Sequence, residues 1–330
     1  MSCPIPLITP APWRAILREN FNRVEALADF LELSSQQRQQ LLFKPTFAIN
    51  VPLRLAQKMA KQNLDDPLVR QFLPTRQENE NHPDFVLDPV QDETFRCEAK
   101  LLHKYEGRVL LVCTSACAMH CRYCFRQNFS YDREDKLFLA EIEAIRSDAS
   151  IHEVILSGGD PLSLSDETLK SLLDQLNAIP HLKRLRFHTR FPIGIPERID
   201  DSFLRLISAC SKQLFFVIHC NHPKELGADL FARLKELQKL GCVLLNQAVL
   251  LKGVNDDAPT LRTLCEELAD QGILPYYLHQ LDRVQGTAHF EVEEEQGRAL
   301  IREIARSLPG YAVPKYVREI AGEPHKTPLN

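Results

Sequence analysis

The sequence predicts an α/β protein whose core is a partial barrel of six β/α units, a (β/α)6 barrel. Short apolar runs of strand length alternate with amphipathic segments of helical period. Strands that alternate with helices pair in parallel through right-handed crossovers. Six units suit a partial barrel better than a complete one of eight, while an open doubly wound sheet shows the same alternation. The strands are expected at 108–114, 153–158, 184–189, 215–220, 242–251 and 275–280, and the helices between them at 138–148, 166–179, 201–211, 230–241 and 258–272.

A helical region precedes this barrel. Apolar residues at helical spacing predict three helices, at 13–33, 34–42 and 52–61. Ser34 or Ser35 is suited to cap the second of them. The stretch before the barrel lacks sustained periodicity and is rich in proline, acidic and amide residues, which predicts a mostly irregular connector over 63–94. We therefore expect a helical N-terminal region and connector at 1–95, the barrel core at 96–290, and a C-terminal helix with an end segment at 291–330.

The composition is that of an ordinary globular chain, with 330 residues, 44% of them hydrophobic and 25% charged, and a net charge of -4. No long run of lysine and arginine occurs, so neither nucleic acid nor a membrane surface is expected as a partner. The N-terminus lacks a basic segment followed by an apolar stretch, and we expect a cytoplasmic protein. In that reducing compartment a cluster of cysteines is more typical of metal binding or catalysis than of disulfides.

Polar side chains follow the predicted strands. The cysteine-containing stretch CAMHCRYC follows the first strand, SGGDP the second and TR the third, and the later strands carry HCNH, NQ and HQLD. Active sites of barrels and of open α/β sheets lie at the carboxyl ends of their strands. The sequence therefore predicts an active site on one rim of the barrel.

Three cysteines lie close together after the first strand: Cys117, Cys121 and Cys124. Thiolates are the usual ligands of iron–sulfur clusters, and three of them leave one iron of a four-iron cluster open to another ligand. The alternative is a structural zinc site, in which His120 completes the usual set of four ligands.

This C-x3-C-x2-C loop, with an aromatic residue before its last cysteine and a strand before it, resembles that of the radical S-adenosylmethionine enzymes. The resemblance implies a [4Fe-4S] cluster on the three cysteines, whose open iron binds S-adenosyl-L-methionine. It also implies the residues that bind S-adenosylmethionine: Tyr123 beside the adenine, the loop Ser157, Gly158, Gly159 and Asp160 at the amino group, and His219 and Gln247 on later strands.

The end of the chain carries Lys326 in a proline-bounded, non-helical segment, GEPHKTPLN. On its own such a lysine is an ordinary solvated side chain. The segment resembles that of the lysine 2,3-aminomutases, in which a lysine followed by TP holds pyridoxal 5'-phosphate as an imine and is catalytic. By the same resemblance Lys104 and Arg108, in LLHKYEGR, bind the phosphate of that cofactor.

The same resemblance implies the residues that bind the substrate. Arg126 is expected to bind the carboxylate of an amino acid, and Asp282 and Glu319 its distal ammonium. Two acids in one cavity repel each other unless a cation lies between them, which favours a lysine-like substrate. The family pattern has an aspartate where this chain has Glu319, so we expect the ammonium in a slightly different place.

The match extends from about residue 60 to residue 330 and resembles the short bacterial aminomutases that prepare β-lysine for translation elongation factor P. It implies an isomerase that converts (S)-α-lysine, L-lysine, to (R)-β-lysine by means of a 5'-deoxyadenosyl radical and the pyridoxal phosphate imine. Expected partners are lysine, an electron donor such as a flavodoxin or ferredoxin and, functionally, the elongation factor P lysyl-ligase. Two alternatives stay open: a radical aminomutase for another amino acid, and a zinc-stabilised binding protein.

Overall fold

The computed structural model describes residues 12–131 and 137–330, so the N-terminal segment with Cys3 lies outside the described residues. The strands form one sheet in chain order, β1 to β10. Sequential order of parallel neighbours is that of a partial (β/α)6 barrel and excludes the doubly wound alternative, whose order reverses at a switch point. The six predicted strands form the parallel centre of the sheet as β3 (Arg108–Thr114), β4 (Glu153–Gly158), β5 (Arg184–Thr189), β6 (Gln213–His219), β7 (Val243–Val249) and β8 (Leu274–His279).

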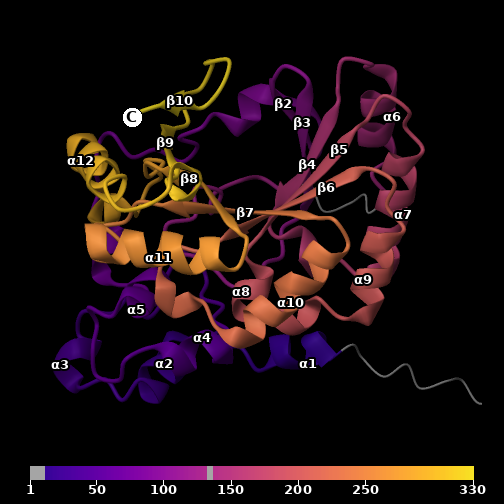
Figure 1. Cartoon of the computed structure of the whole chain (residues 1–330). Helices are drawn as coiled ribbons and strands as arrows, with labels where there is room; N and C mark the ends of the chain where they lie inside the picture. The colour runs from indigo at the N-terminus through magenta and orange to yellow at the C-terminus, as the bar shows by residue number, and fades with distance from the viewer. Residues whose placement is uncertain (1–11, 132–136) are drawn as a thin grey trace, which may run out of the picture.

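Helices cover the outer face of these strands (Figure 1). The predicted helices are present as α6 (Leu139–Ser147), α7 (Asp166–Asn177), α9 (Asp201–Ser208), α10 (Ala228–Lys239) and α11 (Ala258–Asp270), with a short additional α8 (Phe191–Gly194). Helix α7 shows why these segments fold as they do. Ser165 caps its first turn by accepting a hydrogen bond from the Thr168 N–H at 3.1 Å. Its buried face is an apolar stripe at helical spacing: Leu169, Leu172, Leu173 and Leu176.

Short strands extend the sheet beyond the six predicted ones. An antiparallel pair precedes the barrel, and a parallel strand followed by an antiparallel one completes the C-terminal end: β1 (Arg96–Glu98), β2 (Leu101–Tyr105), β9 (Lys315–Arg318) and β10 (Thr327–Pro328). The predicted C-terminal helix is α12 (Glu294–Ile304). The Tyr105 hydroxyl on β2 donates a hydrogen bond to Glu319, just beyond β9, at 2.7 Å. The two ends of the sheet therefore meet at the C-terminal segment.

The N-terminal region contains α1 (Pro12–Arg18), α2 (Val24–Phe30), α3 (Ser35–Arg38), α4 (Leu53–Lys58) and α5 (Pro67–Phe72). The prediction of one helix over 13–33 is wrong, because Phe21 pairs with Val51 in an antiparallel bridge and separates α1 from α2. Ser34 caps α3, as expected. The connector is less irregular than expected, since Asp66 and Pro67 begin α5 within it. Single 3-10 turns lie at Arg76–Asn79, Asp92–Phe95, Pro161–Ser163, Pro196–Arg198, Pro223–Glu225, Ala288–Phe290 and Gly310–Ala312.

The N-terminal helices α1 to α5 lie together beneath the barrel (Figure 1). Their buried side chains belong to the same hydrophobic core as those of the barrel strands. Trp13 on α1 makes an edge-on contact with Phe191 of α8, with ring centroids 5.5 Å apart. The region is therefore an integral layer of the fold, and the predicted part boundaries at 95 and 290 stay predictions. Across the described ranges, no helix has the length and apolar character that a membrane span requires.

We predict that Trp13→Ala lowers the free energy of unfolding by about 3–5 kcal/mol, the usual range for removing a buried aromatic ring. Arg18→Ala, at an exposed position of the same helix, is the control and should change it by less than about 0.5 kcal/mol. Denaturant unfolding measures both. Equal stability of the two variants would show that α1 does not pack on the barrel.

Candidate active site

A cavity of about 770 Å³ occupies the barrel interior. Every residue that the sequence predicts for the site lines it: Cys117, Cys121, Cys124, Tyr123, Ser157, Gly158, Gly159, Asp160, His219, Gln247, Lys104, Arg108, Arg126, Asp282, Glu319 and Lys326. The expectation of a site on one rim is too narrow. Arg108 is the first residue of β3, whereas the cysteines follow its last residue, Thr114, roughly 20 Å away at about 3.3 Å per residue. The cavity thus runs along the strands.

The cysteine loop at one end of this cavity is held by the N-terminal region. The Asn50 side chain donates to the Cys117 carbonyl at 2.9 Å, and the Asn50 carbonyl accepts from the His120 N–H at 2.9 Å. Arg122 donates to the Phe47 carbonyl at 2.7 Å and to Glu78 at 2.8 Å. The loop therefore depends on residues that precede it by about 40 or more positions.

The three cysteines are half-buried thiols at the cavity wall. Burial, the charge of Asp160 and the other two cysteines raise the pKa of Cys117 well above its usual range. Burial and the neighbouring Cys121 raise the pKa of Cys124 to about 11. Thiolates are the form that binds metal, so a metal site here must displace these protons when it forms.

The loop after β4 lies directly against the start of the cysteine loop. A Cβ atom on Gly159 would lie 2.4 Å from the Ala116 carbonyl oxygen, and Gly158 has a positive φ of 107°, so both positions require glycine. The Asp160 carboxylate is buried and accepts hydrogen bonds from the Thr189 hydroxyl at 2.7 Å and from the Arg190 N–H at 2.7 Å. Asp160 therefore fixes the turn, and its oxygens are occupied inside the protein.

Histidines line the middle of the cavity. Gln247 and His219 are register partners on β7 and β6, with Nε2 atoms 2.7 Å apart. Burial, with Arg190 and Arg126 nearby, lowers the pKa of His219 to about 3, so its ring is neutral at physiological pH. Burial also lowers the pKa of His188 and of His279 well below the usual value.

A buried aspartate joins two predicted binding residues. Asp92 accepts from Arg126 on one oxygen and from Lys104 on the other, each at 2.7 Å. Burial opposes ionisation of Asp92, but the charges of Arg126 and Lys104 outweigh it and lower the pKa of this carboxyl. The predicted carboxylate-binding arginine and the predicted phosphate-binding lysine are thus linked through one carboxylate.

Lys326 lies at the end of the cavity that is bounded by β2 and β9. Its ammonium pairs with Glu319, which also accepts from the Tyr105 hydroxyl at 2.7 Å. Burial opposes ionisation of Glu319, yet Lys326 and the hydrogen bonds lower its pKa. Burial raises the pKa of Asp282 to about 7, although the charge of Lys326 opposes this rise. Lys326 therefore keeps Glu319 ionised, whereas Asp282 is held partly protonated by its burial.

The family model of a 4Fe-4S single cluster domain matches residues 105–187, which include all three cysteines. The L-lysine 2,3-aminomutase of Escherichia coli is 43% identical over 87% of this chain and 84% of its own length. That of Haemophilus influenzae is 40% identical over 96% of this chain and 94% of its own length. That of Clostridium subterminale is 31% identical over 96% and 77%. The chain belongs to the lysine 2,3-aminomutase family. It is a radical S-adenosylmethionine enzyme and an isomerase, as the sequence predicts.

The site residues fit the cofactors of this family. The matched family model is that of a 4Fe-4S cluster domain and its match spans the three cysteines, which disfavours the zinc-stabilised binding protein. His120 is held through Nδ1 by the Ala48 carbonyl at 2.8 Å and stacks on Phe47. Across residues 12–131 and 137–330, no three His, Cys, Asp or Glu side chains are grouped around one point suited to a single ion.

Two buried imidazole nitrogens also fit a bound group. Nε2 of His188 and Nε2 of His279 have no hydrogen-bond partner within the part of the chain that the structure describes, and both rings line the cavity. Buried polar atoms without a protein partner are uncommon, and a ligand is one explanation. The polar middle of the cavity thus suits a polar cofactor between the cluster end and Lys326.

Sequence reasoning missed several residues of the cavity wall: Asp92, Tyr105, Arg186, His188, Arg190, Asn221, Tyr276, Tyr277 and His279. Arg190 and Asn221 belong to polar stretches that follow predicted strands. The sequence therefore indicates their place on the barrel but not the residues that they contact. Asp92 lies in the connector and carries no sequence signal of its own.

The raised pKa of Asp282 predicts a pH-dependent stability. The unfolded carboxyl has a pKa of about 4, so the folded state holds this proton more tightly. The contribution is complete below about pH 4 and is lost as the pH rises through about 7. Between about pH 5 and 8 the wild type should therefore lose unfolding free energy relative to Asp282→Asn. Denaturant unfolding tests this, with Asp201→Asn at an exposed position as the control. A constant difference between wild type and Asp282→Asn contradicts the prediction.

Proposed function

We propose that this protein is an L-lysine 2,3-aminomutase that converts free (S)-α-lysine to (R)-β-lysine for the modification of translation elongation factor P. The observation that carries the proposal is that one cavity holds the three cysteines together with Lys326, which pairs with Glu319 and acts electrostatically on Asp282. The 43% identity to an L-lysine 2,3-aminomutase supports the reaction. The (R) product and the link to the elongation factor P lysyl-ligase rest on the sequence resemblance to the short bacterial branch.

Each end of the cavity has its own task in this proposal. Cys117, Cys121 and Cys124 hold the cluster, and S-adenosylmethionine lies beside them along Tyr123, the Ser157–Asp160 loop, His219 and Gln247. Lys326 binds pyridoxal phosphate, with Lys104 and Arg108 at the phosphate. When bound, S-adenosylmethionine and the cluster supply a radical that takes hydrogen from an unactivated carbon, and pyridoxal phosphate supplies a π-bond through which nitrogen migrates. An electron donor such as a flavodoxin or ferredoxin reduces the cluster.

The acids at the second end explain the choice of lysine. When Lys326 carries the cofactor, its nitrogen is no longer a free ammonium, and Glu319 gains room for another cation. The distal ammonium of the substrate takes that place between Glu319 and Asp282. Asp282 is partly protonated near pH 7 and ionises when the ammonium arrives, because an opposite charge lowers a carboxyl pKa.

Arg126 binds the other end of the substrate. Its Nε is used by Asp92, and a terminal nitrogen contacts Ser157 at 3.4 Å, so the guanidinium plane is fixed at the cavity wall. A free amino acid offers a carboxylate to this arginine. An amino acid attached through its carboxyl group does not, and we therefore propose that lysine reacts free.

We predict that Lys326→Ala abolishes β-lysine formation from free lysine, S-adenosylmethionine, pyridoxal phosphate and a strong reductant, and also abolishes the pyridoxal absorbance of the protein. The cause is the loss of the nitrogen that attaches the cofactor. Lys239→Ala, on the outer helix α10, is the control and should retain both. Turnover by Lys326→Ala without an added amine would contradict the proposal.

The second candidate, an aminomutase for another amino acid, is tested by Asp282→Asn. Loss of this charge should raise the KM for lysine more than 10-fold, in line with about 1.4 kcal/mol or more for a buried ionic contact. It should have little effect on an amino acid with an uncharged side chain of similar length. Substrate profiles of the wild type and the variant measure the difference. An equal effect on both substrates would favour the second candidate.

A further inference from the structure

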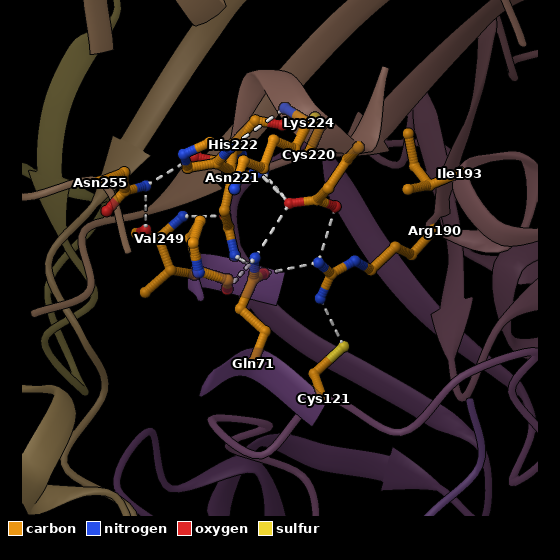
Figure 2. Close-up of polar contacts among 12 residues, drawn as sticks. Gln71, Cys121, Arg190, Ile193, Cys220, Asn221, His222, Lys224, Val249 and Asn255 are labelled. Atoms are coloured by element: carbon orange, nitrogen blue, oxygen red, sulfur yellow. Dashed lines mark hydrogen bonds and ion pairs between the residues drawn. The ribbon is translucent and has the colours of Figure 1, made fainter. Parts of the chain in front are cut away.

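Arg190, which directly follows β5, lies behind the cysteine loop and is 5% exposed. One terminal nitrogen of its guanidinium lies 2.8 Å from the sulfur of Cys121 and also contacts the Tyr123 hydroxyl. The other donates to Gln71 at 2.7 Å and to Glu225 at 2.8 Å. Figure 2 shows the guanidinium between the Cys121 sulfur and the Gln71 side chain. A buried cation therefore touches one of the three cluster ligands.

We propose that Arg190 is a positioning residue that fixes Cys121 and raises the reduction potential of the cluster. An N–H donor to a cluster sulfur, and a positive charge beside it, both stabilise the reduced cluster, which carries one more electron. A cluster that is easier to reduce can be reduced by a weaker electron donor. The inference rests on the iron–sulfur cluster and not on the identity of the substrate, so it is independent of the proposed function.

The orientation of Arg190 is set by Glu225, whose side chain is fully buried. One Glu225 oxygen accepts from the backbone N–H groups of Asn221 at 3.0 Å and His222 at 3.1 Å, which leaves the other oxygen facing Arg190. The Glu225 carboxylate cannot rotate without breaking these bonds. It therefore holds one edge of the guanidinium, and the opposite edge faces Cys121.

Gln71 on α5 completes the support. Its side-chain oxygen accepts from Arg190 and, at 3.0 Å, from the Asn221 amide, while its nitrogen donates to Glu225 at 3.2 Å. Asn221 in turn donates to the Tyr123 hydroxyl at 2.6 Å. A residue of the N-terminal region thus closes a network that includes a cluster ligand and the tyrosine next to the last cysteine.

The backbone of Arg190 links this network to the loop at the end of β4. Its N–H donates to Asp160 at 2.7 Å, and Asp160 belongs to the loop after β4 that we assign to S-adenosylmethionine. Movement of Arg190 would therefore shift Cys121 relative to that loop. The backbone of Arg190 thus has the positioning role, through Asp160, and its guanidinium has the electrostatic role, at the Cys121 sulfur.

The charges make a signed test possible. Arg190 places a positive charge next to the Cys121 sulfur. Glu225 places a negative charge on the other side of Arg190, farther from that sulfur. Arg190→Gln should therefore lower the reduction potential of the cluster, and Glu225→Gln should raise it. Arg190→Lys retains the positive charge but not the planar set of N–H donors of the guanidinium. The reduction potential of its cluster should therefore lie between those of the wild type and Arg190→Gln.

The experiment is an anaerobic redox titration of the reconstituted enzyme with dithionite, followed by electron paramagnetic resonance of the reduced cluster, with iron and sulfide content measured on each sample. Arg186→Gln is the matched control, because Arg186 is a cation of the same cavity that binds Glu153 instead of a cysteine. Its shift should be smaller than that of Arg190→Gln.

Opposite shifts in Arg190→Gln and Glu225→Gln support the proposal. Unchanged potentials in both variants, or shifts in the same direction, overturn it and leave Arg190 a purely structural residue. If Arg190→Gln binds no cluster, Arg190→Lys and Glu225→Gln decide: a Glu225→Gln potential at or below that of the wild type overturns the proposal.

Discussion

The loop that carries Cys117, Cys121 and Cys124 contains neither helix nor strand, so its shape depends on hydrogen bonds from other parts of the chain. Asn50 holds its first cysteine through the backbone, and Arg190 contacts its second through the sulfur. Three thiolates must reach one cluster within a few tenths of an ångström. The N-terminal layer and Arg190, at the carboxyl end of β5, supply the contacts that hold this loop.

The charged side chains of the cavity form ion pairs with one another, and a charged ligand could replace one partner of such a pair. Asp92 lies between Arg126 and Lys104, and Glu319 binds Lys326. Each of these cations is thereby held without burying an unpaired charge, which would be strongly unfavourable. In the proposed function, a substrate with a carboxylate at one end and an ammonium at the other replaces or joins these pairs. The electrostatic pattern that stabilises the protein would then also favour a dibasic amino acid.

The sequence predicts the central part of the fold well, because the six apolar runs have strand length and the segments between them have helical periodicity. It fails where long-range contacts decide. The break between α1 and α2 follows from the pairing of Phe21 with Val51, and β2 and β9 are too short to show a period. All site residues that the motifs predict line the cavity, but other lining residues, such as Asp92 and His188, were not predicted. Gln71 and Glu225 could not be predicted, because nothing in the sequence shows that both side chains accept hydrogen bonds from Arg190.

The radical reaction proposed for this cavity is tested most directly with free lysine that carries deuterium at C3. The proposed radical moves this hydrogen between carbon atoms, and carbon-bound hydrogen does not exchange with water. Mass spectrometry of the β-lysine formed in ordinary water, together with the deuterium content of the solvent, measures its fate. We predict that the deuterium is retained among the molecules bound in the cavity and reappears in β-lysine. Loss of the label to water, or turnover without β-lysine, would contradict this view of the site.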